Sequence, residues 1–338
     1  MRILAEYGND DLAKVYVAQL REEGVQSEDS QKFVVECVES VQPPIPREKK
    51  WVLIVSTMFG CPIKCKFCDA GGDYAGKLTA EEILAQIAYM VRRRFPNDRV
   101  PILKFKIQFA RMGEPSLNPA VLEAMRRLPE MFDAPGLNVS LSTVAPKVGI
   151  ADKFFEELIE IKERYYSQGR FQLQFSIHTT DIDKRDELIP IKKRSFEEIA
   201  AYGDRFCSPE KGDKKVTLNF APAVGYPLDA KIIRKHFDPS KFIIKITPLN
   251  PTVRSHEKSL RSLIDPYDFA TSRCIVESFE REGFEVILSI GELEENKIGS
   301  NCGQYVQRVI RSGVKPESSY DLEKYGVRIF SSRDSDRP

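Results

Sequence analysis

The chain has 338 residues, 51 of them basic and 50 acidic, which gives a formal net charge of +1. With 42% hydrophobic and 30% charged residues, the composition is typical of a globular protein and excludes an intrinsically disordered chain. The neutral balance argues against a nucleic-acid binder that depends on overall positive charge. No run of 18 apolar residues predicts a membrane-spanning helix, and the first residues meet charge too early for a secretory signal. We therefore expect a cytoplasmic protein with no membrane partner.

The seven cysteines are an odd number, and three of them lie within eight positions. This distribution does not resemble the disulfide framework of a secreted domain. It is typical of metal chemistry in a reducing compartment.

The first 50 residues are predicted to form a small N-terminal β-rich cap. Residues 15–20 and 32–41 have the composition of strands, and they are followed by a stiff Pro-Pro-Ile-Pro segment at 43–46. This region is too short for a second large domain.

From residue 51 the chain alternates short apolar runs with helical patterns, which predicts an α/β fold with a parallel sheet. Thr79 and Glu82 form a capping box at the start of the first helix. Six or seven such units predict a partial (βα)6-type barrel over residues 51–290, and residues 291–338 form a C-terminal extension with a disordered tail at 331–338. The expected strands are 51–56, 102–109, 137–143, 171–178, 215–221, 242–249 and 284–290, and the expected helices are 79–95, 119–131, 151–165, 195–206, 228–236 and 266–282.

Cys61, Cys65 and Cys68 follow the first barrel strand, with spacings of three and then two intervening residues. Three thiolates from one loop suit a [4Fe–4S] cluster and leave its fourth iron free to bind another molecule. The alternative is a zinc site, which would need a fourth ligand, and the candidates are Cys37 and the distant His178.

Several polar or glycine-containing segments follow the other predicted strands. Gly113 and Glu114 follow the second strand, and a glycine there would let the backbone approach a ligand closely. Any one of these segments alone is typical of an ordinary turn or cap. The remaining segments are 141–143, 175–178 and 248–251.

The cysteine triplet, with the aromatic Phe67 before the third cysteine, resembles the motif of the radical S-adenosylmethionine (SAM) superfamily. The triplet is followed by the strand-end segments, by the run 185–191 and by the Asn-Cys-Gly-Gln sequence at 301–304. This set of motifs, in this order along the chain, resembles the RlmN/Cfr family. Members of that family methylate carbon atoms of adenosine in RNA. The resemblance extends from about residue 31 to residue 310.

The resemblance implies a [4Fe–4S] cluster and SAM as cofactors and an electron donor such as flavodoxin or ferredoxin. It implies that Cys302 carries the methyl group and that Glu39 accepts a proton. In the family, one SAM methylates the carrier cysteine, and the radical from a second SAM activates that methyl group for addition to a ring carbon. The implied cluster ligands are Cys61, Cys65 and Cys68, and the implied SAM contacts are Gly113, Glu114, Ser142, Ser176, Ile177, His178 and Asn250.

Two features depart from the family pattern. The family's resolving cysteine lies seven residues before the first cluster cysteine, and here that position is Ile54. Cys37 is the one N-terminal thiol that could replace it, and strand alternation places it on the same face as Glu39. In addition, only 60 residues precede the cluster motif, too few for the family's N-terminal RNA-binding domain.

The basic clusters do not clearly replace that domain. The arginines at 92–94 end a helix and are expected to complement its dipole, and the basic residues at 192–194, 211, 214 and 215 are expected in solvated loops. The substrate therefore remains open among RNA, a nucleotide and another small molecule.

Three functional hypotheses follow. The first is one-carbon transfer through a methylated Cys302, and the second is direct use of the 5′-deoxyadenosyl radical on a small molecule or peptide, with Cys302 structural. The third is a non-catalytic metal- or RNA-binding relative.

Overall fold

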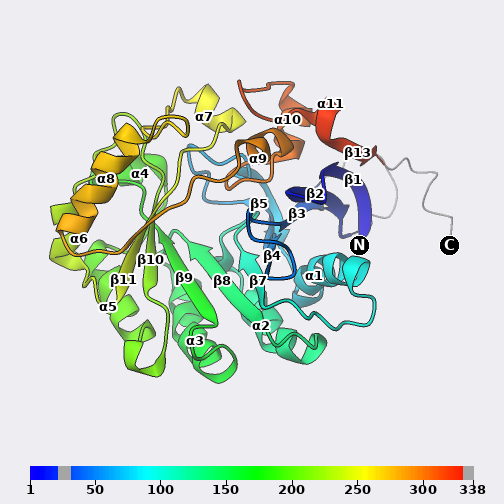
Figure 1. Ribbon diagram of the computed structural model, residues 1–338, viewed down its shortest axis with the longest axis horizontal. Coiled ribbons are helices and arrows are strands. Elements are labelled where there is room, and N and C mark those ends of the chain that lie inside the picture. Colours follow the sequence, from blue (N-terminus) through cyan, green and yellow to red (C-terminus); the bar gives the residue numbers. More distant parts are fainter. Residues whose placement is uncertain (22–31, 330–338) are drawn as a thin grey trace.

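The structure, a computed structural model, describes residues 1–21 and 32–329; the tail expected to be disordered at 331–338 lies outside this range. Its main feature is an 11-stranded sheet in the order β12-β11-β10-β9-β8-β7-β4-β3-β2-β1-β13. The strands from β4 to β12 are mutually parallel, so the predicted α/β partial barrel is confirmed (Figure 1). These are β4 (Lys50–Val55), β7 (Lys104–Phe109), β8 (Leu137–Thr143), β9 (Phe171–Ser176), β10 (Val216–Phe220), β11 (Phe242–Ile246) and β12 (Val286–Leu288).

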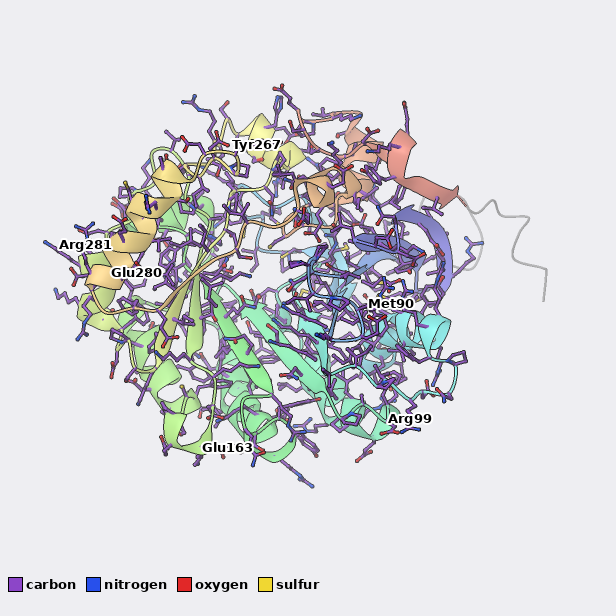
Figure 2. The ribbon with its side chains drawn as sticks, in the orientation of Figure 1. Met90, Arg99, Glu163, Tyr267, Glu280 and Arg281 are labelled. Carbon is purple, nitrogen blue, oxygen red and sulfur yellow. The ribbon has the colours of Figure 1, made fainter. Side chains whose placement is uncertain are left out.

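Helices connect the parallel strands and cover the outer side of the sheet (Figure 1). The capping box of Thr79 and Glu82 opens α1 as predicted. Charged side chains such as Arg99, Glu163 and Arg281 lie at the periphery of the molecule (Figure 2). The helices are α1 (Ala80–Arg94), α2 (Ala120–Met131), α3 (Gly149–Tyr165), α4 (Ile182–Leu188), α5 (Phe196–Phe206), α6 (Ala230–His236) and α8 (Phe269–Arg281), of which the short α4 was not predicted.

The two faces of the parallel sheet differ in polarity. Residues that alternate along the strands, such as Trp51, Phe105 and Phe175, pack against the helices in one large hydrophobic core. The residues between them, such as Gln108 and Gln174, point to the inner side. Barrel interiors are usually filled by branched apolar side chains, so this polar inner face indicates space for a ligand.

Four antiparallel strands extend the sheet beyond β4. The predicted N-terminal strands correspond to β2 (Ala13–Gln19) and β3 (Val34–Ser40), while β1 (Arg2–Gly8) was missed. Because β3 pairs with β4, residues 1–50 join the same sheet as the barrel strands. The outermost strand is β13 (Gly326–Ile329), which returns from the C-terminal region to pair with β1.

Short elements surround the end of the sheet that carries the predicted site. The hairpin of β5 (Met58–Cys61) and β6 (Gly72–Lys77) encloses the cysteine loop. In the C-terminal region, α9 (Leu293–Ile298), α10 (Val306–Ser312) and α11 (Leu322–Tyr325) lie beside β1, β2 and β3, and α7 (Val253–Glu257) follows β11 (Figure 1). No helix in the described part of the chain is both long and apolar enough to cross a membrane.

Candidate functional site

The cysteine loop brings its three thiols together. Cys61 ends β5, and Cys65 and Cys68 lie in the turn that follows. Cys61 and Cys65 are buried, and burial raises the pKa of all three thiols; neighbouring thiols of the triplet raise the pKa of Cys65 and Cys68 further. Hydrogen bonds from the backbone of Ile63, Lys64 and Gly113 to Cys61 lower its pKa, but they oppose only part of the rise that burial causes.

The donor set fits an iron–sulfur cluster. Within residues 1–21 and 32–329, no three His, Cys, Asp or Glu side chains surround a point that would hold one metal ion. A cluster does not require this, because each thiolate binds a different iron atom. The two candidate fourth ligands for zinc are committed elsewhere: Cys37 is buried in the core on the helix side of the sheet, and His178 Nδ1 accepts the Ala221 N–H at 3.1 Å.

Glu114 fixes the loops that follow β7 and β8. Its buried carboxylate accepts the Ser116 N–H at 3.1 Å, the Ser116 hydroxyl at 2.6 Å, the Val144 N–H at 2.9 Å and the Thr143 hydroxyl. Gly113 has φ of +95°, and a Cβ there would stand 2.7 Å from Met58 and from Thr57 Oγ1. These residues shape the backbone beside Cys61, and the Glu114 carboxylate is already satisfied by protein donors.

A cavity of about 780 Å³ lies between the inner face of the sheet and the C-terminal region. Three predicted SAM contacts, Ser142, Ser176 and Asn250, line it together with Cys302. The exposed Tyr267 stands at its rim (Figure 2). The structure therefore assembles these strand-end residues and the predicted carrier around one space.

Four other predicted SAM contacts lie outside the cavity wall. Besides Gly113 and Glu114, Ile177 is fully buried in the core, and His178 is buried with φ of +66°. The His178 ring packs edge-on against the Phe67 ring, with 4.7 Å between the ring centroids. Burial and the nearby Arg185 lower the pKa of His178 to about 3, so the ring is neutral and supports the cysteine loop.

The loop that carries Cys302 is tied to the barrel by Arg111, whose role the sequence did not reveal. The Arg111 guanidinium donates to the carbonyl of Gly299 at 2.8 Å and to those of Ser300 and Asn301 at 3.2 Å. It also forms a fully buried ion pair of 2.6 Å with Glu36 of β3. One side chain at the end of β7 thus fixes both the N-terminal strands and the Cys302 loop.

Further contacts join this loop to the cysteine triplet. The Asp69 N–H donates to the Gly303 carbonyl at 2.8 Å, and the Asn250 amide donates to the Cys302 carbonyl at 2.9 Å. Gly303, the residue after Cys302, packs on the cysteine loop: a Cβ on Gly303 would stand 3.4 Å from the Phe67 carbonyl oxygen and 3.8 Å from Cys68 Cα. The predicted carrier is therefore adjacent to the predicted cluster site.

The Cys302 side chain is exposed to the cavity yet surrounded by protein. Burial raises the pKa of this thiol, while Lys245 and Arg111 act in the opposite direction. Lys245 also lines the cavity. A cation beside a thiol favours the thiolate, which is the nucleophilic form.

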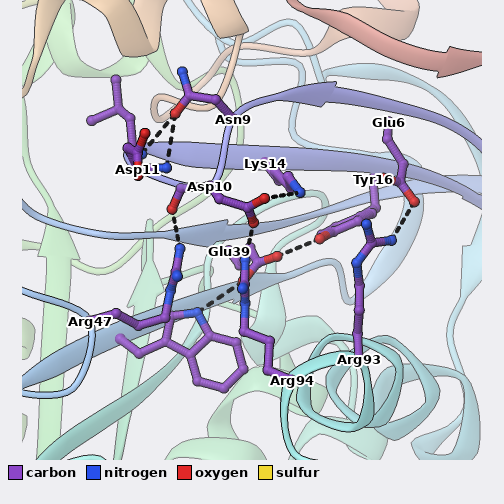
Figure 3. A network of polar contacts seen from close by, with 12 residues as sticks. Glu6, Asn9, Asp10, Asp11, Lys14, Tyr16, Glu39, Arg47, Arg93 and Arg94 are labelled. Carbon is purple, nitrogen blue, oxygen red and sulfur yellow. Dashed lines mark hydrogen bonds and ion pairs between the residues drawn. The ribbon is translucent and has the colours of Figure 1, made fainter.

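The structure does not bring Glu39 to the cavity, so the prediction of its role as proton acceptor must be corrected. Its carboxylate points to the helix side of the sheet, where it binds the hydroxyl of Tyr16, the indole N–H of Trp51 at 3.1 Å and the guanidinium of Arg94 (Figure 3). Cys37 shares that face by alternation and is fully buried. The cavity wall instead receives Ser40, from the opposite face of β3.

Two other residues of the cavity wall, Ile54 and Glu295, are relevant to the predicted reaction. Ile54 occupies the position of the family's resolving cysteine and lines the same cavity as Cys302. Glu295, which the sequence analysis did not single out, also lines it and accepts the Ser40 hydroxyl at 3.2 Å. Burial raises the pKa of Glu295 to about 7.

The fold is similar to that of a solved radical SAM protein. A solved radical SAM methyltransferase from Sphaerobacter thermophilus matches 90% of this chain and 80% of its own, with a TM-score of 0.68 and 21% identity. No protein-family model matches the chain.

Curated relatives narrow the resemblance to RlmN. Proteins named "Probable dual-specificity RNA methyltransferase RlmN" are 27% identical over 223 residues in Pseudothermotoga lettingae and 33% identical over 161 residues in Prochlorococcus marinus. These matches cover 63% and 47% of this chain, but only 59% and 42% of the relatives. The RlmN-like character expected from the motifs is confirmed.

Proposed function

We propose that this protein is a radical SAM methyltransferase that transfers a one-carbon unit to a substrate carbon through a methylated Cys302. The observation that carries the proposal is the position of Cys302, which lies on the wall of the cavity and next to the cysteine triplet. The RlmN-like sequence and the radical SAM fold support it.

Cys61, Cys65 and Cys68 would hold a [4Fe–4S] cluster, and Ser142, Ser176 and Asn250 offer polar groups to SAM in the adjoining cavity. Such a cluster would supply the electron that cleaves SAM to methionine and a 5′-deoxyadenosyl radical, which would act on the methyl group held by Cys302. Flavodoxin or ferredoxin would be a suitable electron donor, and the cytoplasm a suitable compartment.

Cys302 acts as the nucleophile that accepts the methyl group. Lys245 favours its thiolate, and Arg111 fixes its loop to Glu36 of β3 through the carbonyls of residues 299–301. The sulfur then presents a thioether to the cavity, where the substrate binds.

In this proposal Glu295 is the proton acceptor, the role that the family resemblance implied for Glu39. A base must remove a proton from the substrate carbon after the new bond forms, and a carboxylate with pKa near 7 is suited to that task at neutral pH. Glu295 is on the cavity wall and has one side-chain partner in the described structure, the Ser40 hydroxyl. Ile54 offers no thiol for release of the product, so release requires another thiol or a different route.

RlmN relatives are named as RNA methyltransferases, and adenosine in RNA is one possible substrate. The alternatives are a nucleotide or another small molecule. The second candidate function, direct action of the radical on the substrate, is favoured by Ile54, because the family's route for releasing a cysteine adduct lacks its thiol there.

The test is anaerobic incubation of the iron-loaded protein with SAM and reductant, followed by digestion. We expect 5′-deoxyadenosine and a methyl group on the Cys302 peptide. Alanine variants of Cys61, Cys65 and Cys68 should lose iron and SAM cleavage, whereas Cys274→Ala, an exposed thiol outside the site, should keep both. Cleavage without any methyl on Cys302 would support the second candidate, and failure to bind iron would support a non-catalytic relative.

A further inference from the structure

Five lysines lie on the inner side of the sheet, four of them toward the amino-terminal ends of the strands and Lys245 nearer the carboxyl end of β11. Lys104 and Lys106 of β7 alternate with the core residues Phe105 and Ile107, so they share the inner face with Gln108 of the cavity wall. Lys50 of β4 is in register with Lys104 and also points inward. The remaining two members of this lysine cluster are Lys214 and Lys245.

Contacts across the sheet place the last two beside the others. Lys214 Nζ donates to Asn138 Oδ1 at 3.2 Å, and Asn138 is in register with Lys106. Lys245 lines the cavity from β11 and is within electrostatic range of both Lys106 and Lys50. Lys214 lies in the loop before β10, as the sequence suggested, but the residue is half-buried and its ammonium group contacts Asn138 of β8.

No acidic side chain in the described part of the chain neutralises the lysine cluster. None of the five lysines forms an ion pair with any residue in the described ranges. Burial lowers the pKa of Lys50, Lys106 and Lys214, and the neighbouring lysines lower it further. Protonated lysines close together and away from water are unfavourable, and a bound anion would favour their protonated, charged form.

A second observation points to a ligand at the same level. Asn219 is in register with Lys245 and lines the cavity, and its buried Oδ1 has no hydrogen-bond partner in the described structure. Lys245 is the member of the lysine cluster that lines the cavity, so a molecule inside the cavity can place an anionic group beside Lys245 and its other end toward Cys302.

From this arrangement we propose that the lysine cluster binds the phosphate groups of a small phosphorylated molecule, such as a nucleotide, and orients it in the cavity. That this molecule is the substrate rests on the function proposed above, whereas the anion site itself does not. A small molecule is favoured over RNA because these lysines are on the inner face of the sheet. The arginines of the run 92–94, which could have met an RNA backbone on the outside, are instead paired with Asp98, Glu6, Asp10 and Glu39.

The test is titration calorimetry of the anaerobically purified holoprotein with inorganic pyrophosphate, ADP and adenosine. Pyrophosphate and ADP should bind, and adenosine should bind at least about tenfold more weakly than ADP. Lys106→Met should weaken pyrophosphate binding about 10- to 100-fold. Lys106→Met should also raise the melting temperature of the free protein, because it removes repulsion between neighbouring lysines. Loss of a merely structural lysine would not combine weaker pyrophosphate binding with higher stability. The control Lys153→Met changes an exposed lysine of α3 and should alter neither property.

Absence of pyrophosphate binding, or equal binding by the wild type and Lys106→Met, would overturn the proposal. Binding of a single-stranded RNA oligonucleotide without binding of pyrophosphate would overturn it in favour of a polymer. Pyrophosphate binding reports on the lysines alone and Cys302 methylation on the proposed function alone, so failure of one is distinguishable from failure of the other.

Discussion

Replacing Arg111 by methionine should destabilise the protein strongly and release the Cys302 loop. The substitution leaves Glu36 as a buried, unpaired carboxyl that retains the Gln307 N–H at 3.0 Å, and it removes the donors to three loop carbonyls. Breaking a buried ion pair costs about 3–5 kcal/mol. Burial already raises the pKa of Glu36, so protonation relieves part of this cost, and we expect the free energy of unfolding to fall by about 3–4 kcal/mol.

The measurement is equilibrium unfolding in urea, with limited proteolysis of the C-terminal region and iron content as further readouts. The double variant Arg111→Met/Glu36→Gln should recover about 1–2 kcal/mol, because it removes the orphaned charge. The matched control is Arg92→Met, which breaks an exposed ion pair with Asp98 and should cost less than about 1 kcal/mol. If Arg111→Met cost no more than this control, or if the double variant were no more stable than the single one, the role given to Arg111 would be refuted.

Three further substitutions test the cavity. Because the pKa of Glu295 is raised from the usual 4.5 to about 7, the folded state holds this proton more tightly, and its contribution to stability is lost as pH rises from 4.5 through 7. Glu295→Gln should therefore raise the free energy of unfolding at pH 8 by about 1–3 kcal/mol while lowering product formation, and a change of the opposite sign in stability would disprove the assignment. Ile54→Cys places a thiol on the cavity wall and should form a disulfide with Cys302 on mild oxidation. Non-reducing peptide mapping would detect this disulfide, with Ile54→Ser as the control. Identical maps for the two variants would argue that residues 54 and 302 do not face the same cavity. Gly113→Ala should cost about 2 kcal/mol or more in urea unfolding, since its Cβ would stand 2.7 Å from Met58 and the φ is positive, and a neutral result would contradict the tight turn beside Cys61.

The barrel was predictable because its elements are long and strongly periodic. The β8 boundaries match the predicted 137–143, and the capping box of Thr79 and Glu82 marks the start of α1. Short elements gave no such signal. The β5–β6 hairpin is brief and rich in glycine, and α9, α10 and α11 of the C-terminal region depend on contacts with β1 to β3 that are distant in sequence.

The error over Glu39 has a physical cause. Alternation along β3 correctly places Cys37 and Glu39 on one face, but every residue of this strand is buried, so polarity does not reveal which face meets the cavity. Glu295 and Arg111 gave no comparable signal in the sequence. Their roles arise where the C-terminal loop packs on the barrel. The lysines of β7 did alternate visibly in sequence, but only the register with neighbouring strands shows that they gather with Lys50 and Lys214.

The most direct test of Cys302 as carrier follows the hydrogen atoms of its methyl group. Protein is first methylated anaerobically with SAM bearing a deuterated methyl group, then freed of that SAM and supplied with unlabelled SAM and reductant. We predict deuterium in the 5′-deoxyadenosine from the wild type and none from Cys302→Ala. Release of 5′-deoxyadenosine without deuterium from the wild type, with no label on the Cys302 peptide, would contradict a methyl group carried on Cys302.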